Sequence, residues 1–189
     1  MRELLAPRIF VVRPEAISRR SRVPNVAGVY AWYFNQAPSG VPLEGTHVQS
    51  EWHLLYVGIS PRRPRLVDGK PSSGKIRRRI RTHYGSDASR STLRFSLGAL
   101  LCRDLDLQLQ LSDQSGRWTF GPGETRLSAW MATHTKVCWL EHAEPWLVED
   151  ALIATVPLAL NLDSNSSGYF YSELRSARAA LRDARQVTL

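Results

Sequence analysis

The chain of 189 residues carries 25 basic and 17 acidic side chains, and 43% of its residues are hydrophobic. This length suits one well-cored domain, the composition is that of a soluble globular protein, and no apolar run approaches a membrane span. Cys102 and Cys138 lie in apolar surroundings without metal-ligand spacing, which indicates reduced core thiols. Because no signal peptide opens the sequence, we expect a cytoplasmic protein.

The first 27 residues form a lead-in, in which we expect a short strand over residues 8–13. The basic arm that follows, at Arg19, Arg20 and Arg22, is consistent with a solvated surface and equally with a contact to DNA.

Two strands follow the lead-in. Residues 28–34 are β-branched and aromatic, which predicts a strand with Tyr30, Trp32 and Phe34 on one side. After a loop over residues 35–52, residues 53–60 predict a second strand. Its alternation puts Leu54, Tyr56 and Gly58 on one face. If the two strands pair antiparallel, Tyr30 and Tyr56 lie on a common surface of the sheet.

The next segment contains most of the excess positive charge. Between Arg62 and Arg94 there are eleven basic residues and only two acidic ones, while the rest of the chain is nearly neutral. A single basic patch is typical of a protein that binds a polyanion, whereas an ordinary charged surface mixes both signs. We therefore expect nucleic acid as the partner. The residues expected to contact it are Arg62, Arg63, Arg65, Lys75, Arg77, Arg78, Arg81, Arg90 and Arg94.

A basic helix is predicted over residues 75–83. Ile76 and Ile80 are four apart and define its buried stripe, and Arg79 and His83 share that stripe. The other arginines of the helix point elsewhere. A buried Arg must be paired or must bind an anionic ligand, so Arg79 is a candidate for a functional role.

The middle of the chain predicts further support for the sheet. Residues 91–101 and 123–134 have helical patterns, residues 105–120 alternate around a turn as a hairpin does, and residues 136–140 read as a central apolar strand. The tryptophans of this part and of the next helix are expected to be core residues: Trp130, Trp139 and Trp146.

Pro145 opens a helix that is apolar almost all round, which predicts a buried helix. Glu149 shares a stripe with Trp146 and Leu152 and should be an inward carboxylate. Such a carboxylate either pairs with an Arg, for example Arg79, or binds a cation, and the two readings have equal weight. The last segment, residues 171–189, predicts an amphipathic helix capped by Ser172 and packed on the same domain.

These elements predict an α/β (α+β) domain, with a small, mainly antiparallel sheet of about three central strands flanked by helices, an extra hairpin and a C-terminal helix. Their order resembles the GIY-YIG nuclease family. The segments 28–30 and 56–58 match its two tripeptides, with Val in place of Ile in both, and the Arg-rich helix follows. The resemblance covers residues 28–161 and implies a nuclease domain over 28–170. Carried over one at a time, its site residues are Tyr30, Tyr56, Arg79, Glu149 and Asn161, with His83 following the Arg as in many members.

The resemblance implies a metal-dependent endonuclease that hydrolyses phosphodiester bonds, with DNA expected in preference to RNA, during restriction, repair or structure-specific cleavage. Glu149 would hold one divalent cation, Mg²⁺ or Mn²⁺, and Arg79 would bind the phosphate oxygens. Tyr30 or His83 would accept the proton of the attacking water, and Tyr56 and Asn161 would position the phosphate and Glu149. Two alternatives remain: a ribonuclease or toxin that uses the same site, and a nucleic-acid-binding module without activity.

Overall fold

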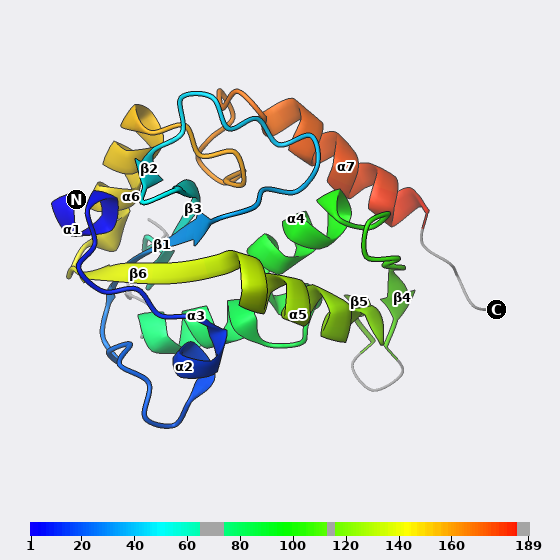
Figure 1. Ribbon diagram of the computed structural model, residues 1–189, viewed down its shortest axis with the longest axis horizontal. Helices are drawn as coiled ribbons and strands as arrows, with labels where there is room; N and C mark the ends of the chain where they lie inside the picture. Colours follow the sequence, from blue (N-terminus) through cyan, green and yellow to red (C-terminus); the bar gives the residue numbers. More distant parts are fainter. Residues whose placement is uncertain (65–73, 113–115, 185–189) are drawn as a thin grey trace.

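A four-stranded antiparallel sheet forms the centre of the computed structural model, which describes residues 1–64, 74–112 and 116–184 (Figure 1). Its strand order is β2-β3-β1-β6. The predicted antiparallel α+β architecture is therefore confirmed. All seven residues of β1 are buried, because this strand has a neighbour on both edges and helices on both faces. The strands are β1 (Gly28–Phe34), β2 (Val48–Gln49), β3 (Trp52–Ser60) and β6 (Thr135–Glu141).

The strand β6 lies at the edge of the sheet, so its prediction as a central strand was wrong. Its apolar side chains are explained by packing on both faces of the sheet, with Val137 on one face and Cys138 on the other. At the outer edge, Val11 of the lead-in exchanges two backbone hydrogen bonds of 2.9 Å with Val137. The predicted strand over 8–13 is reduced to this single bridge. Helix α2 (Arg13–Ile17) begins immediately afterwards, with Pro14 in its first turn, where a missing N–H does no harm.

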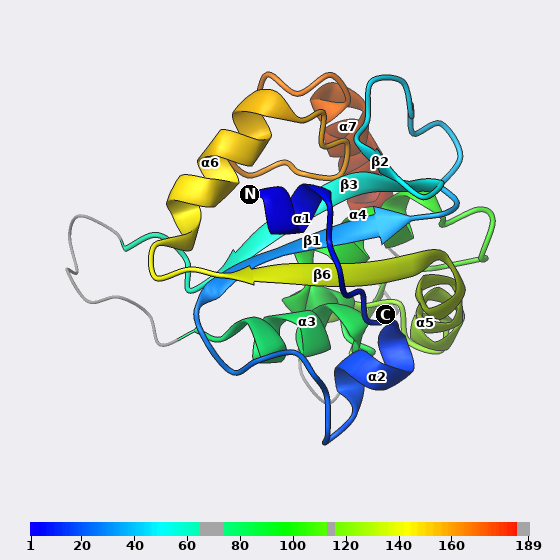
Figure 2. The ribbon, with the colours of Figure 1, turned by 60° about the vertical axis from the view of Figure 1, so that its left-hand side comes forward.

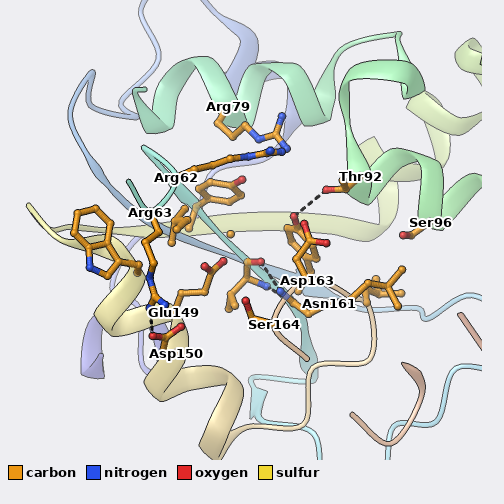
Figure 3. A pocket seen from close by; sticks show the side chains of 18 of the residues that line it. Arg62, Arg63, Arg79, Thr92, Ser96, Glu149, Asp150, Asn161, Asp163 and Ser164 are labelled. Carbon is orange, nitrogen blue, oxygen red and sulfur yellow. Dashed lines mark hydrogen bonds and ion pairs between the residues drawn. The ribbon is translucent and has the colours of Figure 1, made fainter. Parts of the chain in front are cut away.

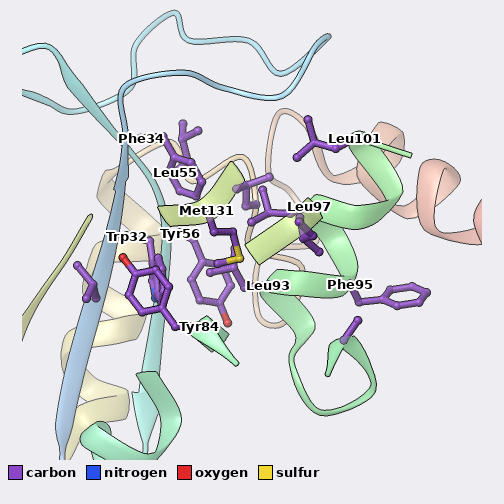
Figure 4. Close-up of a cluster of buried hydrophobic side chains, with 14 of the residues drawn as sticks. Trp32, Phe34, Leu55, Tyr56, Tyr84, Leu93, Phe95, Leu97, Leu101 and Met131 are labelled. Carbon is purple, nitrogen blue, oxygen red and sulfur yellow. The ribbon is translucent and has the colours of Figure 1, made fainter. Parts of the chain in front are cut away.

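Helices cover both faces of the sheet (Figure 2). The alternation predicted for β1 is confirmed: Tyr30, Trp32 and Phe34 belong to the larger apolar cluster, and Val29, Ala31 and Tyr33 to the smaller one. Figure 4 shows the larger cluster, where aromatic rings of the sheet meet leucines of the helices. The helices on that side are α3 (Ile76–Tyr84), α4 (Thr92–Leu100) and α5 (Gly123–His134), and those on the other side are α1 (Arg2–Leu5) and α6 (Pro145–Thr155).

A β-bulge in β3 changes which side chains share a face. Trp32 pairs with Tyr56 but Tyr33 pairs with Leu54, so Leu55 is an extra residue. Leu54 therefore packs in the smaller cluster, and the prediction that it shares a face with Tyr56 was wrong. Beyond the bulge, Tyr56 and Gly58 do lie on the Tyr30 face, as predicted.

Helix α4 is joined to α5 by a buried ion pair. Arg94 is fully buried and donates from Nε to a carboxylate oxygen of Glu124 at 3.1 Å, while the other carboxylate oxygen accepts the backbone N–H of Ala88 at 2.8 Å. Arg94 therefore cannot belong to the exposed basic surface for which it was predicted. The 3₁₀ turn η1 (Ala88–Arg90) connects α3 to α4 and is held by the same carboxylate.

The prediction that helix α6 is buried was wrong. Of its residues only Pro145 and Leu152 are buried, and Leu147 is 53% exposed. The helix packs on the sheet along one side and faces solvent along the other (Figure 2), so an apolar composition did not require complete burial.

The last two predicted elements are present. The hairpin consists of β4 (Gln110–Leu111) and β5 (Trp118–Thr119), and the C-terminal helix α7 (Tyr171–Asp183) packs on α4. Ser172 lies inside α7 and does not cap it. Across the described ranges of the chain, every helix is too short or too polar to cross a bilayer.

Candidate active site

A pocket of about 250 Å³ opens where β1 and β3 run between α3 and α6 (Figure 3). Side chains from six helices and strands, and from the loops after β3 and α6, converge there. In Figure 3, Arg62 and Arg79 lie on one side and Glu149 on the opposite side. The pocket is lined by all five residues that the resemblance carried over: Tyr30, Tyr56, Arg79, Glu149 and Asn161.

The sixth predicted site residue, His83, is buried behind Tyr30. Its Nε2 lies 2.9 Å from the Tyr30 hydroxyl, and its Nδ1 lies 2.7 Å from the hydroxyl of Ser91. The Ser91 oxygen also accepts the backbone N–H of Arg94 at 3.0 Å, as an N-cap does. Within the described residues, His83 Nδ1 is the acceptor available to the Ser91 proton. His83 therefore carries its own proton on Nε2 and donates it to Tyr30.

Burial keeps this chain of groups uncharged in the free protein. It lowers the pKa of His83 well below 6.5, and the nearby charges of Arg79 and Arg94 act in the same direction. Burial raises the pKa of Tyr30 well above 10. Arg79 acts on the Tyr30 pKa in the opposite direction, as a base would require, but burial outweighs it.

The glycines of the two tripeptides are explained by close packing. Gly58 lies opposite Tyr30 in the sheet, and a Cβ at this position would come within 2.5 Å of the Tyr30 hydroxyl. A Cβ at Gly28 would come within 2.3 Å of the backbone oxygen of Leu140 on β6. Neither position can accept a side chain. Gly58 leaves room for the ring of Tyr30, and Gly28 allows β1 to pair with β6.

Arg79 reaches the pocket from α3, as its place on the Ile76–Ile80 stripe predicted. It is half-buried, and its Nη1 donates to the backbone oxygen of Arg90 at 3.0 Å. This contact anchors one edge of the guanidinium group, which also donates toward the Tyr30 hydroxyl and so acts to lower the Tyr30 pKa, and the N–H donors that remain face the pocket.

The other basic residues divide into three groups. Arg62 and Arg63 line the pocket, and Arg63 forms an ion pair with Asp150. Arg77 and Arg81 donate to backbone oxygens of the lead-in, so they hold α2 and its following loop against α3. Those exposed away from the pocket are Lys75, Arg78 and Arg90, and Arg65 lies outside the described residues.

Glu149 is one of three carboxylates that line the pocket, with Asp150 and Asp163, and among the described residues it has neither an ion pair nor a hydrogen bond. The pair with Arg79, one of the two alternatives expected from the sequence, is not formed. Burial raises the pKa of Glu149 to about 7, and the negative charges of Asp150 and Asp163 add to this effect. Arg63 and Arg62 oppose it.

The donor set fits a hard divalent cation with an incomplete protein shell. No cluster of three His, Cys, Asp or Glu side chains suited to a metal ion occurs in residues 1–64, 74–112 and 116–184. Mg²⁺ commonly takes one or two carboxylates and completes its octahedral shell with water and substrate phosphates. The unpaired Glu149, with Asp163 in the same pocket, provides such a set.

Asn161 holds the edge of β3. Its side-chain oxygen accepts the N–H of Val57 and its amide nitrogen donates to the oxygen of Val57, both at 2.9 Å. The backbone of Leu160 adds a bond of 2.9 Å to the oxygen of Leu55. Because both amide atoms of Asn161 are engaged, its part in the site is to position the strand between Tyr56 and Gly58.

Several pocket residues were missed from the sequence. Trp146, expected in the core, lines the pocket one turn before Glu149, a spacing that could have predicted it. Ser91 could be recognised as an N-cap, but its contact with His83 could not. The remaining lining residues gave no local signal: Thr92, Ser96, Asp163, Ser164 and Arg178.

The fold and this pocket define a nuclease-type catalytic domain. A family model described as the GIY-YIG catalytic domain matches residues 28–186. The chain therefore belongs to the GIY-YIG family. The match begins at β1 and continues through α7, beyond the segment that the motifs alone indicated. Comparison with the curated proteins and with the solved structures gave no significant match in either case.

The packing of Tyr30 on Gly58 predicts the effect of one added methyl group. Gly58→Ala should lower the free energy of unfolding by about 1–3 kcal/mol, because the ring must leave its place. A double-mutant cycle by chemical denaturation checks this. In a Tyr30→Ala background the same substitution should cost little. An equal cost in both backgrounds would contradict the assigned clash.

The pKa of Glu149 predicts a pH-dependent stability. An ordinary Glu has a pKa of 4.5 and the folded protein raises it to about 7, so the folded state holds this proton more tightly and loses stability as the pH rises from 4.5 to 7. Glu149→Gln should therefore be more stable than the parent by about 1–2 kcal/mol at pH 8, allowing for solvent screening.

The difference should vanish below pH 4.5, which denaturation in chelator across this pH range measures. The exposed Glu144 supplies the control, since Glu144→Gln should not change the pH dependence. A Glu149→Gln protein no more stable than the parent at pH 8 would contradict the raised pKa.

Proposed function

We propose that the protein is a metal-dependent endonuclease that hydrolyses phosphodiester bonds, with DNA preferred to RNA. The observation that carries the proposal is the unpaired carboxylate of Glu149, held in one pocket with Arg79 and Tyr30. A phosphodiester is anionic and water is a poor nucleophile, so its hydrolysis needs positive charge at the phosphate and an acceptor for the proton of water. This pocket offers groups for both requirements.

Glu149 is the ligand for the cation. A divalent cation, one Mg²⁺ or Mn²⁺ per site, would supply Lewis-acid chemistry at the phosphate and the positive charge that lowers the pKa of Tyr30. Glu149 itself must ionise to bind it, which its pKa of about 7 permits near neutrality.

Arg79 binds the non-bridging oxygens of the scissile phosphate. Its anchoring on the backbone oxygen of Arg90 fixes the guanidinium before substrate arrives. A donor fixed in advance costs no reorganisation when charge develops in the transition state. The planar group also offers two parallel N–H donors, which a Lys does not.

Tyr30 orients the attacking water and accepts its proton once its own has been lost. His83 supports this role as a donor, because its Nε2–H stabilises the negative oxygen of an ionised Tyr30. His83 does not line the pocket and its pKa is low, so it is a positioning residue and not the base.

The basic side chains around the pocket support a nucleic-acid substrate. Arg62 and Arg63 lie at the pocket, and Arg78 and Arg90 line a second hollow of about 420 Å³ on the outer side of α3. A ribonuclease or toxin could use the same groups, which an RNA substrate tests. A module that only binds nucleic acid gains nothing from a carboxylate that repels phosphate, so Glu149 speaks against that reading.

The first test removes the carboxylate charge. Glu149→Gln should abolish cleavage of supercoiled, linear or branched DNA in Mg²⁺ or Mn²⁺, and should preserve folding and binding, because the amide replaces a cation ligand without adding bulk. Glu144→Gln, on the exposed start of α6, is the matched control and should cut like the parent. Cleavage that persists in chelator, or in Glu149→Gln, would refute the metal mechanism.

A second test separates Arg79 from its neighbour Arg78. Arg79→Ala should lower turnover by on the order of a hundredfold, because it removes a donor that acts on the transition state. Arg78 is exposed and outside the pocket, so Arg78→Ala should weaken binding modestly and leave turnover nearly unchanged. Arg79→Lys should restore part of the lost activity.

Single-turnover kinetics and binding by fluorescence anisotropy give the two quantities, and thermal denaturation verifies that each variant is folded. The assignment fails if folded Arg79→Ala cuts normally while Arg78→Ala does not.

A further inference from the structure

Helix α7 brings an arginine to the pocket from a part of the chain that contributed no predicted site residue. Arg178 lines the pocket, whereas the other arginines of this helix, Arg175 and Arg182, are exposed outside it. The position is fixed by packing, because Leu174 and Leu181 on the same helix are buried and α7 rests on α4.

The guanidinium group of Arg178 has no acceptor of its own. It lies over the ring of Phe95, 5.1 Å from the centroid, and is half-buried, so burial lowers its pKa. Asp163 is close enough to act on the charge of Arg178, but the two form no ion pair. Among the described residues no hydrogen bond or ion pair reaches this group. A half-buried guanidinium without a partner is costly unless an anion binds to it.

Ser96 is a second, independent sign of a missing ligand. Its side chain is 1% exposed, it lines the same pocket from α4, and within the described residues its hydroxyl has no hydrogen-bond partner. Figure 3 shows it at the end of the pocket away from Glu149, on the side of Thr92. Because it lines the pocket and has no partner within the described protein, this hydroxyl is open to hydrogen-bond what occupies the pocket.

We propose that Arg178 and Ser96 form a second phosphate subsite, which binds the phosphodiester adjacent to the scissile one in the cleaved strand. The inference rests on the proposed nuclease function. A guanidinium and a hydroxyl are common partners of phosphate oxygens, and both are supplied here by side chains fixed on helices. Arg79 on α3 and Arg178 on α7 then bind successive phosphates, and Glu149 serves only the first.

Binding to DNA tests the subsite without any cleavage. In chelator, Arg178→Ala should weaken the affinity for a short labelled duplex about tenfold and reduce the slope of log Kd against log salt by about 0.9, the contribution of one neutralised phosphate. Ser96→Ala should weaken binding less and leave the slope unchanged, because it removes a hydrogen bond and no charge. Arg178→Gln, which keeps most of the side chain, should match Arg178→Ala.

Arg182→Ala is the matched control, because Arg182 lies over the same Phe95 ring, 4.9 Å from the centroid, but outside the pocket. It should lose the same stacking contact and bind DNA within about twofold of the parent, since an exposed charge is screened. If Arg178→Ala and Arg182→Ala have equal effects on affinity and melting temperature, Arg178 only packs on the ring and the subsite is overturned.

Cleavage kinetics on two substrates distinguish the scissile phosphate from the neighbouring one. Thymidine 5′-(p-nitrophenyl phosphate) contains one phosphodiester and no neighbour, so Arg178→Ala should lower kcat/KM for DNA about tenfold and leave kcat/KM for this compound unchanged. Equal losses on both substrates would place Arg178 at the scissile phosphate and overturn the assignment.

If the parent binds DNA through Arg178 but never cuts, the subsite stands and the nuclease proposal fails. If the parent cuts DNA and Arg178→Ala cuts it equally fast, the nuclease proposal stands and the subsite is overturned. A parent that neither binds nor cuts refutes both.

Discussion

The pairing of the Asn161 amide with the backbone of Val57 is the interaction on which the pocket depends. Among the described residues, no strand pairs with β3 along this part of its outer edge, and Asn161 occupies the place where one would pair. The residues on either side of Val57 are Tyr56 and Gly58, one a wall of the pocket and the other the surface on which Tyr30 rests. One amide therefore fixes both tyrosines, and it joins the loop after α6 to the strand that this loop faces.

Burial of the ionisable side chains in and behind the pocket is the second constraint on the site. The same burial that keeps Tyr30 and His83 neutral raises the pKa of Glu149 to about 7, so Glu149 is only partly ionised near neutral pH. A bound cation would favour its ionised form further, which couples occupation of the cation site to the charge of the pocket.

The sequence predicted those features that depend on local pattern. The alternation of β1 and the inward position of Arg79 on α3 follow from strand and helix periodicity, and the family motifs supplied Glu149 and Asn161. What it could not predict depends on contacts between distant segments. Arg94 is removed from the basic surface by Glu124, thirty residues away, and β6 is an edge strand whose outer side is bridged by Val11, more than a hundred residues earlier. Ser96 and Arg178 line the same pocket only because α7 packs on α4.

The anchoring of α3 by the lead-in has a consequence for where the folding unit begins. Arg77 and Arg81 each donate to backbone oxygens in residues 17–23, and Val11 protects the edge of β6, yet the family match starts at residue 28. A chain cut back to the matched residues would leave two guanidinium groups without acceptors on the helix that presents Arg79, and an unprotected strand open to self-association. The contacts that hold α3 and the edge of β6 in place therefore extend beyond the residues that the family match covers.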